Sequence, residues 1–291
     1  MIPDEIIQVL EKHVDSAILP ETARSVGGGC IHEALLVDKE DGGLLFLKQD
    51  TAETLPLFAA EEKSLNLLRS TNTIRVPGPI LSGSGREKAF LAMEGLKMSS
   101  RASGAAQRSL GKKLAALHSH STDTRFFGAS FNNYIGATPQ SNHRHEDWAD
   151  FFITERLTPQ FRFAEKRGKR FDQEDAVLTA IHSHLRSLSI SPSLLHGDLW
   201  GGNVGFLEND EPVIFDPASY YGDRETDLAF TSMFGGFSAA FYEAYREINP
   251  APEPVRETIY NLYHLLNHFT LFGGSYASSA EASIREILKT I

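Results

Sequence analysis

The sequence predicts an α+β protein with two lobes, an antiparallel-sheet lobe followed by a mainly helical lobe. Short apolar runs that are typical of strands dominate the first 93 residues, whereas apolar residues recur at helical spacing in most segments after residue 104. A third observation is a stretch at residues 194–216, LLHGDLWGGNVGFLENDEPVIFD, in which short apolar runs alternate with Asp, Asn and Gly. We therefore assign residues 1–93 to the N-terminal lobe, and residues 94–291 to a hinge and the helical lobe.

The N-terminal lobe opens with an amphipathic segment and a glycine triplet. Residues 3–17 carry apolar side chains at helical spacing and predict a helix. Gly27, Gly28 and Gly29 lie between two strand-like runs, where glycine lets the backbone bend and bring N–H groups to a phosphate. We expect a phosphate-binding loop here, although a plain turn would have the same composition.

A lysine at the end of a strand and a glutamate on the next helix form a second feature of this lobe. Residues 44–47 read as a buried strand that leads to Lys48, whose ammonium group can reach the phosphates of a nucleotide. Residues 57–69 predict a helix on which Glu61 faces inward and holds Lys48 by an ion pair. Glu62 is the competing partner, and both glutamates could instead be solvated surface charges.

Two strand-like runs close the lobe and lead into the hinge. Residues 74–83 predict a strand broken by two prolines, and residues 89–93 predict a buried strand. Backbone groups of the hinge can bond the edge of an adenine ring without any particular side chain. The residues expected to do so are Met93, Glu94, Gly95 and Leu96.

The second lobe is predicted to be mainly helical. Aromatic side chains at helical spacing belong more often to a core than to a ligand site. We expect His118 to mark the end of a helix rather than to bind a metal. Helices are expected at residues 105–118, 173–188, 226–247, 254–272 and 276–290, and Trp148 opens another.

The stretch at residues 194–216 holds the groups that phosphoryl transfer needs. Asp198 follows a His-Gly turn, Asn203 lies five residues later, and Asp216 ends a short apolar run. Kinases place a catalytic Asp, an Asn and a metal-binding Asp in this order. Asn203 and Asp216 offer hard oxygen ligands for Mg²⁺, and Asp198 can orient an acceptor hydroxyl and take its proton late. The alternative is a hairpin turn with solvent-facing carboxylates.

Two single residues near these motifs carry hypotheses of their own. Trp200 follows Asp198 by two residues and either stacks on a substrate or packs in the core. Cys30 directly follows the glycine triplet, so its oxidation to a sulfenic acid, a mixed disulfide or a Cys30–Cys30 dimer would hold the loop and reduce nucleotide access. The competing interpretation of Cys30 is a small strand residue without a redox role.

Composition limits the partners and the compartment. The net charge of −10 argues against broad binding of nucleic acid. One cysteine excludes an intrachain disulfide, and the acidic start lacks the pattern of a signal peptide, so we expect a cytoplasmic protein. No apolar run approaches the length of a membrane span.

The chain resembles the fructosamine kinase (ketosamine-3-kinase) family over nearly its whole length, and hence the protein-kinase-like fold. The motif HGDLWGGN at residues 196–203 is the most specific part of this resemblance. Three further matching stretches are FGASFNNYIGATPQSN at 127–142, FDPASYYGDRETDLAFTSMFGGF at 215–237 and LLNHFTLFGGSY at 265–276.

The resemblance implies an enzyme that uses ATP and Mg²⁺. Asp198 would be the proton acceptor, Asn203 and Asp216 would bind the metal, and Lys48 and Glu61 would serve the phosphates. Asp227 would be structural and tie the catalytic loop to its helix. The implied reaction is transfer of the γ-phosphate to the C3 hydroxyl of a ketosamine, which leads to deglycation of the amine.

Two other functions remain open at this point. An aminoglycoside or choline type of phosphotransferase would use the same catalytic set, although Trp200-Gly201-Gly202 and the NNYIGATPQ loop argue against it. A catalytically silent nucleotide-binding regulator would usually lack one of the catalytic groups, all of which are present. The preferred sugar, the choice between free and protein-bound amines, and the oligomeric state, a monomer or a dimer linked through Cys30, also remain open.

Overall fold

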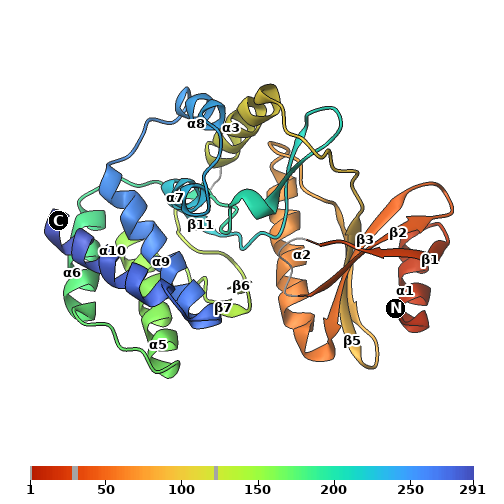
Figure 1. Cartoon of the computed structure of the whole chain (residues 1–291), viewed down its shortest axis with the longest axis horizontal. Helices are drawn as coiled ribbons and strands as arrows, with labels where there is room; N and C mark the ends of the chain where they lie inside the picture. Colours follow the sequence, from red (N-terminus) through yellow and green to blue (C-terminus); the bar gives the residue numbers. More distant parts are fainter. Residues whose placement is uncertain (1, 28–31, 121–123) are drawn as a thin grey trace.

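The computed structural model describes residues 2–27, 32–120 and 124–291, which form two lobes (Figure 1). This bilobal α+β architecture confirms the predicted fold class. The N-terminal lobe contains α1 (Asp4–Val14), β1 (Ile18–Ser25), β2 (Glu33–Lys39), β3 (Leu44–Thr51), α2 (Leu55–Ser70), β4 (Pro79–Ser84) and β5 (Lys88–Glu94). β5 ends beside the proposed boundary at residues 93 and 94, which remains a prediction.

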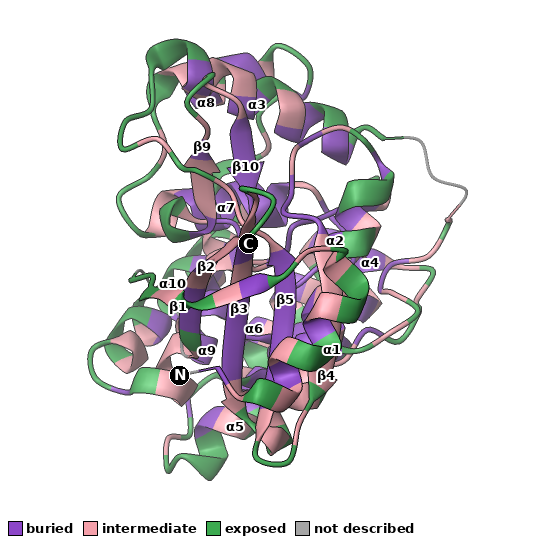
Figure 2. Cartoon of the chain, turned by 90° about the vertical axis from the view of Figure 1, so that its right-hand side faces the viewer, coloured by how far each residue is buried: buried purple, intermediate pink, exposed green. Residues whose placement is uncertain are grey.

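The five strands form one antiparallel sheet in the order β1-β2-β3-β5-β4. Side chains alternate across it, so Leu45 and Leu47 face one side and Lys48 faces the other. α1 covers the first face, where Ile6 and Leu10 pack against Leu45 and Leu47. α2 covers the second face, which is turned toward the helical lobe (Figure 1). The central strands β3 and β5 are mostly buried (Figure 2). This alternation brings Lys48 to the same side of the sheet as α2.

The helical lobe is built around α9. Its helices are α3 (Gly104–His118), α4 (Trp148–Phe151), α5 (Thr158–Lys166), α6 (Glu174–Arg186), α7 (Glu225–Met233), α8 (Ala239–Arg246), α9 (Pro254–Phe272) and α10 (Tyr276–Thr290). One face of α9 supplies Ile259, Leu262 and Leu266 to the largest apolar core of the chain. None of the described helices is long and apolar enough to cross a membrane.

Short strands join the helices of this lobe. The first hairpin consists of β6 (Asn133–Ile135) and β7 (Thr138–Gln140), and it lies between α9 and α2 (Figure 1). β8 (Ser193–Leu194) pairs with β11 (Tyr221–Gly222), and β9 (Val204–Phe206) pairs with β10 (Pro212–Ile214). These two pairs frame the stretch that carries the candidate catalytic residues.

The prediction of one helix over residues 226–247 was wrong. α7 ends at Met233, and Gly235 and Gly236 adopt φ values of +91° and +71° before α8 begins. Such left-handed backbone is open to glycine and interrupts helical hydrogen bonding. Aromatic side chains on both sides of the break keep a helical spacing, which concealed it in the sequence.

The helix that starts at Trp148 contains a second irregularity. Residues Phe152–Leu157 form a π-helical segment between α4 and α5. Arg156 in this segment is fully buried, and its guanidinium carbon lies 3.9 Å from the ring centroid of Tyr220. Its N–H groups donate to the carbonyls of Ser141 and Glu155 and to Asn142 Oδ1. A buried charge is stable here because most of its donors are hydrogen-bonded and its face is stacked.

Candidate active site

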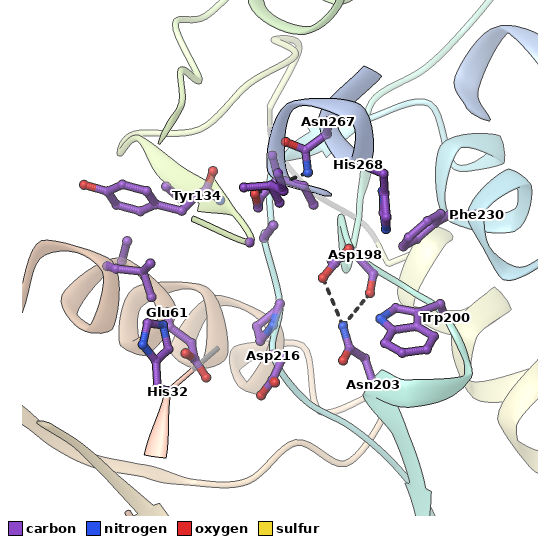
Figure 3. A pocket seen from close by; sticks show the side chains of 18 of the residues that line it. His32, Glu61, Tyr134, Asp198, Trp200, Asn203, Asp216, Phe230, Asn267 and His268 are labelled. Carbon is purple, nitrogen blue, oxygen red and sulfur yellow. Dashed lines mark hydrogen bonds between the residues drawn. The ribbon is translucent and has the colours of Figure 1, made fainter. Parts of the chain in front are cut away.

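A cavity of about 430 Å³ lies between the two lobes. In Figure 3, His32 and Glu61 stand on one side and Trp200, Phe230 and His268 on the other, with Asp198, Asn203 and Asp216 between them. The described residues that sequence reasoning did not assign to the site include His32, Asn133, Tyr134, Phe234, Asn267, His268 and Phe272. Most of them lie in the 127–142, 215–237 and 265–276 stretches that carry the family resemblance, which is the signal that points to them.

Lys48 forms the predicted ion pair. Its Nζ lies 2.6 Å from Glu61 Oε1 and 2.7 Å from Asp216 Oδ1. Burial disfavours the charged ammonium, but the carboxylates of Asp216 and Glu61 outweigh it and raise the pKa of Lys48. Glu62, the competing partner, instead accepts a hydrogen bond from the backbone N–H of Ser82. The lysine therefore stays charged and connects α2 to the loop that carries Asp216.

Asp227 holds the turn that precedes the candidate catalytic loop. Its carboxylate accepts the backbone N–H groups of His196 and Gly197 at 2.8 and 2.9 Å. Gly197 has a φ of +84°, and a Cβ there would lie 2.1 Å from the carbonyl oxygen of Ala218. Only glycine fits such a turn without strain. The expectation that Asp227 ties the loop to its helix agrees with these contacts.

His118 extends this network, which the sequence did not indicate. Its ring is buried at the end of α3, with Nε2 3.1 Å from Asp227 and Nδ1 2.7 Å from the hydroxyl of Tyr245. Burial opposes the charged carboxylate of Asp227, but its hydrogen bond and electrostatic interaction with His118 outweigh burial and lower its pKa. The electrostatic interaction with His196 and the hydrogen bond from the N–H of Gly197 lower it further. The position at a helix end was predicted, but its partners come from α7 and α8.

Asp198 and Asn203 lie in direct contact. Asn203 Nδ2 donates to the carbonyl oxygen of Asp198 at 2.8 Å and to its Oδ2 at 3.1 Å. Burial, followed by the charge of Asp216, raises the pKa of Asp198 to about 7. Among the described residues, Oδ1 of Asp198 has no hydrogen-bond partner. One oxygen of the carboxylate is thus fixed, and the other is available to a bound molecule.

Asp216 adopts a backbone conformation that is uncommon for its residue type. Its φ is +58°, in the left-handed region that Asp and Asn tolerate better than most residues. The N–H of Phe215 donates to the carbonyl of Asn203 at 3.1 Å, and the N–H of Ala218 donates to that of His196 at 2.9 Å. These bonds fix the segment on both sides of Asp216. The strained residue therefore points its carboxylate into the cavity beside Asn203 (Figure 3).

The glycine triplet is only partly within the described residues. Gly27 is exposed, and no atom lies within 4 Å of a Cβ built on it. Gly28, Gly29 and Cys30 lie outside the described residues, so the proposed phosphate loop and the redox role of Cys30 stay predictions.

The hinge residues do not line the cavity. Met93 is 2% exposed and packs in the core. The N–H groups of Glu94 and Gly95 are already bonded to the carbonyls of Gly78 and Leu44. The N–H of Leu96 donates none of the described hydrogen bonds. Of the backbone N–H groups of Glu94, Gly95 and Leu96, it is therefore the one that remains to bond an adenine edge. The assignment of these residues to adenine stays a prediction.

Trp200 lines the cavity and meets the edge of Phe234, with 5.7 Å between ring centroids. A Cβ at Gly202 would lie 2.3 Å from the indole, so the following glycine makes room for this ring. Trp200 is half-buried, and its ring stands beside Asp198 and Asn203 (Figure 3). Packing and ligand contact are both compatible with this position.

The fold and the arrangement of Lys48, Glu61, Asp198, Asn203 and Asp216 define a phosphotransferase of the protein-kinase-like class. An aminoglycoside phosphotransferase of known structure shares the fold, with a TM-score of 0.64 at 13% identity over 98% of both chains. A family model described as fructosamine kinase matches residues 2–290. The chain therefore belongs to the fructosamine kinase family, and it is an ATP-dependent kinase.

Individual relatives agree with this assignment. A "Probable ketoamine kinase" of Synechocystis is 44% identical over 270 residues, which are 91% of this chain and 90% of the relative. The chloroplastic "Protein-ribulosamine 3-kinase" of Arabidopsis thaliana is 37% identical over 92% of this chain and 82% of its own. The crystal structure of a "Putative fructosamine-3-kinase" from Haemophilus somnus has a TM-score of 0.89 at 31% identity, covering 97% and 96% of the two chains.

Proposed function

We propose that this protein transfers the γ-phosphate of ATP to the C3 hydroxyl of ketosamines, the rearranged adducts that sugars form with amines. The observation that carries the proposal is the gathering of Lys48, Asp198 and Asp216 around one cavity. The names of the ketoamine and ribulosamine kinases among its relatives support the choice of acceptor. The cavity of about 430 Å³ is large enough for a small sugar–amine adduct.

Asp198 is the group proposed to receive the proton of the C3 hydroxyl. Asn203 holds its Oδ2, which leaves Oδ1 to accept a hydrogen bond from the hydroxyl and to orient it. Proton transfer follows late, as the new O–P bond acidifies the hydroxyl. Lys48, held by Glu61, neutralises charge on the ATP phosphates.

The residues at the cavity fit a magnesium ion. Mg²⁺ prefers hard oxygen ligands, and Asp216 offers a partly exposed carboxylate. The bonds from Asn203 Nδ2 to Asp198 leave the amide oxygen of Asn203 turned toward Asp216 (Figure 3). We propose that these two side chains hold the ion. When bound, Mg²⁺ neutralises charge on the phosphates during transfer.

Phosphorylation at C3 would release the amine from its sugar. The C3 phosphate lies next to the C2 ketone, so it leaves with its bonding electrons once that ketone enolises toward C1. Hydrolysis of the remaining adduct frees the amine. The proposed biological role is therefore the repair of glycated amines.

Trp200 is proposed to contact the acceptor. Its ring lines the cavity two residues after Asp198, on the side away from Glu61 (Figure 3). In Trp200→Phe, a selective rise in the KM for the ketosamine supports contact, whereas lower thermal stability with an unchanged KM assigns the ring to packing.

A substrate panel tests the proposed function. Fructosamine, ribulosamine and erythrulosamine adducts, free and protein-bound, are compared with aminoglycosides and choline for ATP consumption. We expect turnover of at least one ketosamine, with a phosphate ester at C3 by ³¹P NMR and subsequent release of the amine. Turnover of aminoglycosides or choline alone would favour another small-molecule kinase. ATP binding without turnover of any acceptor would favour a silent regulator.

A further inference from the structure

The β6–β7 hairpin forms one wall of the cavity. Asn133, Tyr134, Ile135 and Gly136 line the cavity together with Ala218 of the loop after Asp216. The segment that leads into the hairpin faces the N-terminal lobe, where Nζ of Lys63 on α2 lies 5.9 Å from the ring centroid of Phe131. The position of the hairpin therefore sets the width of the cavity on the side where the two lobes meet.

A chain of buried side-chain hydrogen bonds fixes this hairpin. The hydroxyl of Tyr263 on α9 donates to Gln140 Oε1 at 2.5 Å. Gln140 Nε2 donates to Asn133 Oδ1 at 2.7 Å and to the carbonyl of Ala218 at 3.3 Å. Asn133 Nδ2 in turn donates to the carbonyl of Ser219 at 3.0 Å. The Tyr263 hydroxyl thereby determines which end of the Gln140 amide faces Asn133.

These side-chain hydrogen bonds continue to the buried Arg156. Asn142 Nδ2 also donates to Asn133 Oδ1, at 3.0 Å, while Asn142 Oδ1 accepts from Arg156 at 2.6 Å. Asn133, Gln140 and Asn142 are each at most 3% exposed, so water does not replace these bonds easily. An unmade bond at such a depth leaves a desolvated amide without a partner.

The loop against which the hairpin rests is held independently. Backbone bonds join Ala218 to His196 at 2.9 Å and Tyr220 to Leu195 at 3.0 Å. In the described part of the chain, by contrast, every hydrogen bond from residues 131–141 to the rest of the lobe involves a side chain. Loss of the side-chain bonds would free the hairpin and leave the catalytic loop in place.

We propose that Gln140 and Tyr263 are positioning residues that fix the β6–β7 hairpin as the acceptor wall and so set the affinity for the ketosamine. This inference rests on the proposed function for the identity of the acceptor. Neither residue lines the cavity, so neither touches the acceptor. They act through Asn133 and the backbone next to it.

Tyr263→Phe removes only the hydroxyl that donates the first hydrogen bond of this network, the bond to Gln140. We expect the KM for the fructosamine or ribulosamine adduct of butylamine to rise about threefold to tenfold, which is the effect of one net hydrogen bond. The KM for ATP is expected to stay within about twofold of the wild-type value. Gln140→Met removes the amide and raises the same KM further. Adding Tyr263→Phe to Gln140→Met has no additional effect, because the hydroxyl acts through that amide.

Tyr260→Phe is the matched control. Tyr260 lies one turn earlier on α9, is buried, and bonds Trp148 and Asp223 instead of the hairpin. This variant is expected to lose thermal stability and to keep the ketosamine KM. Equal changes of the ketosamine KM in Tyr260→Phe and Tyr263→Phe would overturn the proposal, as would a KM for Tyr263→Phe within twofold of wild type.

Hydrogen exchange separates this inference from the proposed function. In Tyr263→Phe, the backbone amides of residues 131–141 are expected to exchange faster, while those of residues 194–199 keep their wild-type rates. Unchanged exchange in the hairpin would contradict the positioning role whatever the substrate. If wild type phosphorylates no ketosamine, the proposed function fails, and exchange alone decides the role of Gln140 and Tyr263.

Discussion

At the scale of single residues, side-chain direction decides whether Glu61 or Glu62 pairs with Lys48. Both glutamates lie on α2, but Glu61 is 8% exposed and bonds Lys48, whereas Glu62 bonds the backbone of β4. Adjacent positions on a helix differ by about 100° in direction. The sequence supplied the candidates, and the packing of α2 on the sheet selected one of them.

This difference makes the two residues a matched pair. We expect Glu61→Gln to lower kcat at least about tenfold, or about 1.4 kcal/mol, because the lysine is no longer held between two carboxylates. Glu62→Gln keeps a side-chain oxygen for Ser82 and is expected to leave kcat within about twofold. Steady-state kinetics at saturating ATP measures both, and a similar loss in the two variants would refute the assignment of Glu61.

The carboxylate of Asp198 is expected to matter for turnover and little for nucleotide binding. Asp198→Asn keeps the shape of the side chain but cannot accept a proton, so kcat should fall at least about a hundredfold, the lower range for general base catalysis. ATP affinity, measured by calorimetry, should stay nearly unchanged. A turnover within roughly tenfold of wild type would remove Asp198 from this role.

Asp216 is tested with a substitution that respects its backbone. Asn tolerates the φ of +58°, so Asp216→Asn isolates the loss of charge, whereas Asp216→Ala also adds backbone strain. We expect Asp216→Ala to abolish turnover and Asp216→Asn to retain a trace that raised Mg²⁺ improves only weakly. A normal magnesium dependence in either variant would show that the metal lies elsewhere.

At the scale of elements, strands and helices were predictable where their pattern is local. β5, α3, α9 and α10 agree with apolar runs or helical spacing in the sequence. The break between α7 and α8 did not follow from helical spacing, because the aromatic side chains keep that spacing across Gly235 and Gly236. The π-helical segment did not follow from it either, because it depends on how neighbouring elements pack. The cavity wall likewise combines residues from α2, the β6–β7 hairpin and α9, whose contacts are long-range.

The contact between α3 and α8 depends on one glycine. A Cβ at Gly111 would lie 2.3 Å from the carbonyl oxygen of Phe241 and 3.1 Å from the N of Tyr245. Gly111→Ala therefore pushes the helices apart and is expected to cost about 1–3 kcal/mol of unfolding free energy. Gly104→Ala is the control, since a Cβ there meets nothing within 4 Å.

Urea denaturation measures both variants. The control should stay within about 0.5 kcal/mol of wild type, because Ala is at least as favourable as Gly in a helix. Equal stabilities of the two variants would show that α3 and α8 adjust to the added carbon.

At the scale of the whole molecule, Lys48 of the first lobe and Asp216 of the second are joined by an ion pair at 2.7 Å. The family resemblance implied that Lys48 serves the phosphates and that Asp216 binds the metal. The separation along the chain, 168 residues, explains why no local pattern indicates their direct contact. The cavity therefore lies where an ion pair joins the two lobes.

Nucleotide binding should therefore stabilise the whole chain. With MgATP at about 100 times its Kd, the free energy of unfolding is expected to rise by about 2.7 kcal/mol. Lys48→Met should lose most of this increase, whereas Lys112→Met, at an exposed lysine paired with Glu247, should keep it. Denaturation with and without MgATP provides the comparison, and full protection of Lys48→Met would exclude a phosphate role for this lysine.

The π-helical segment at Phe152–Leu157 places a constraint on length rather than on composition. It contains one residue more than an α-helix would need, and each residue turns an α-helix by about 100°. A π-helical turn takes up such an extra residue as a local bulge, so the flanking α4, with Trp148, and α5, with Phe161, keep the phase of one continuous helix. The bulge changes the direction of the side chains within it, and Arg156 in this segment stacks on Tyr220. Deleting one residue of the segment would restore a plain α-helix and carry the guanidinium of Arg156 away from that ring.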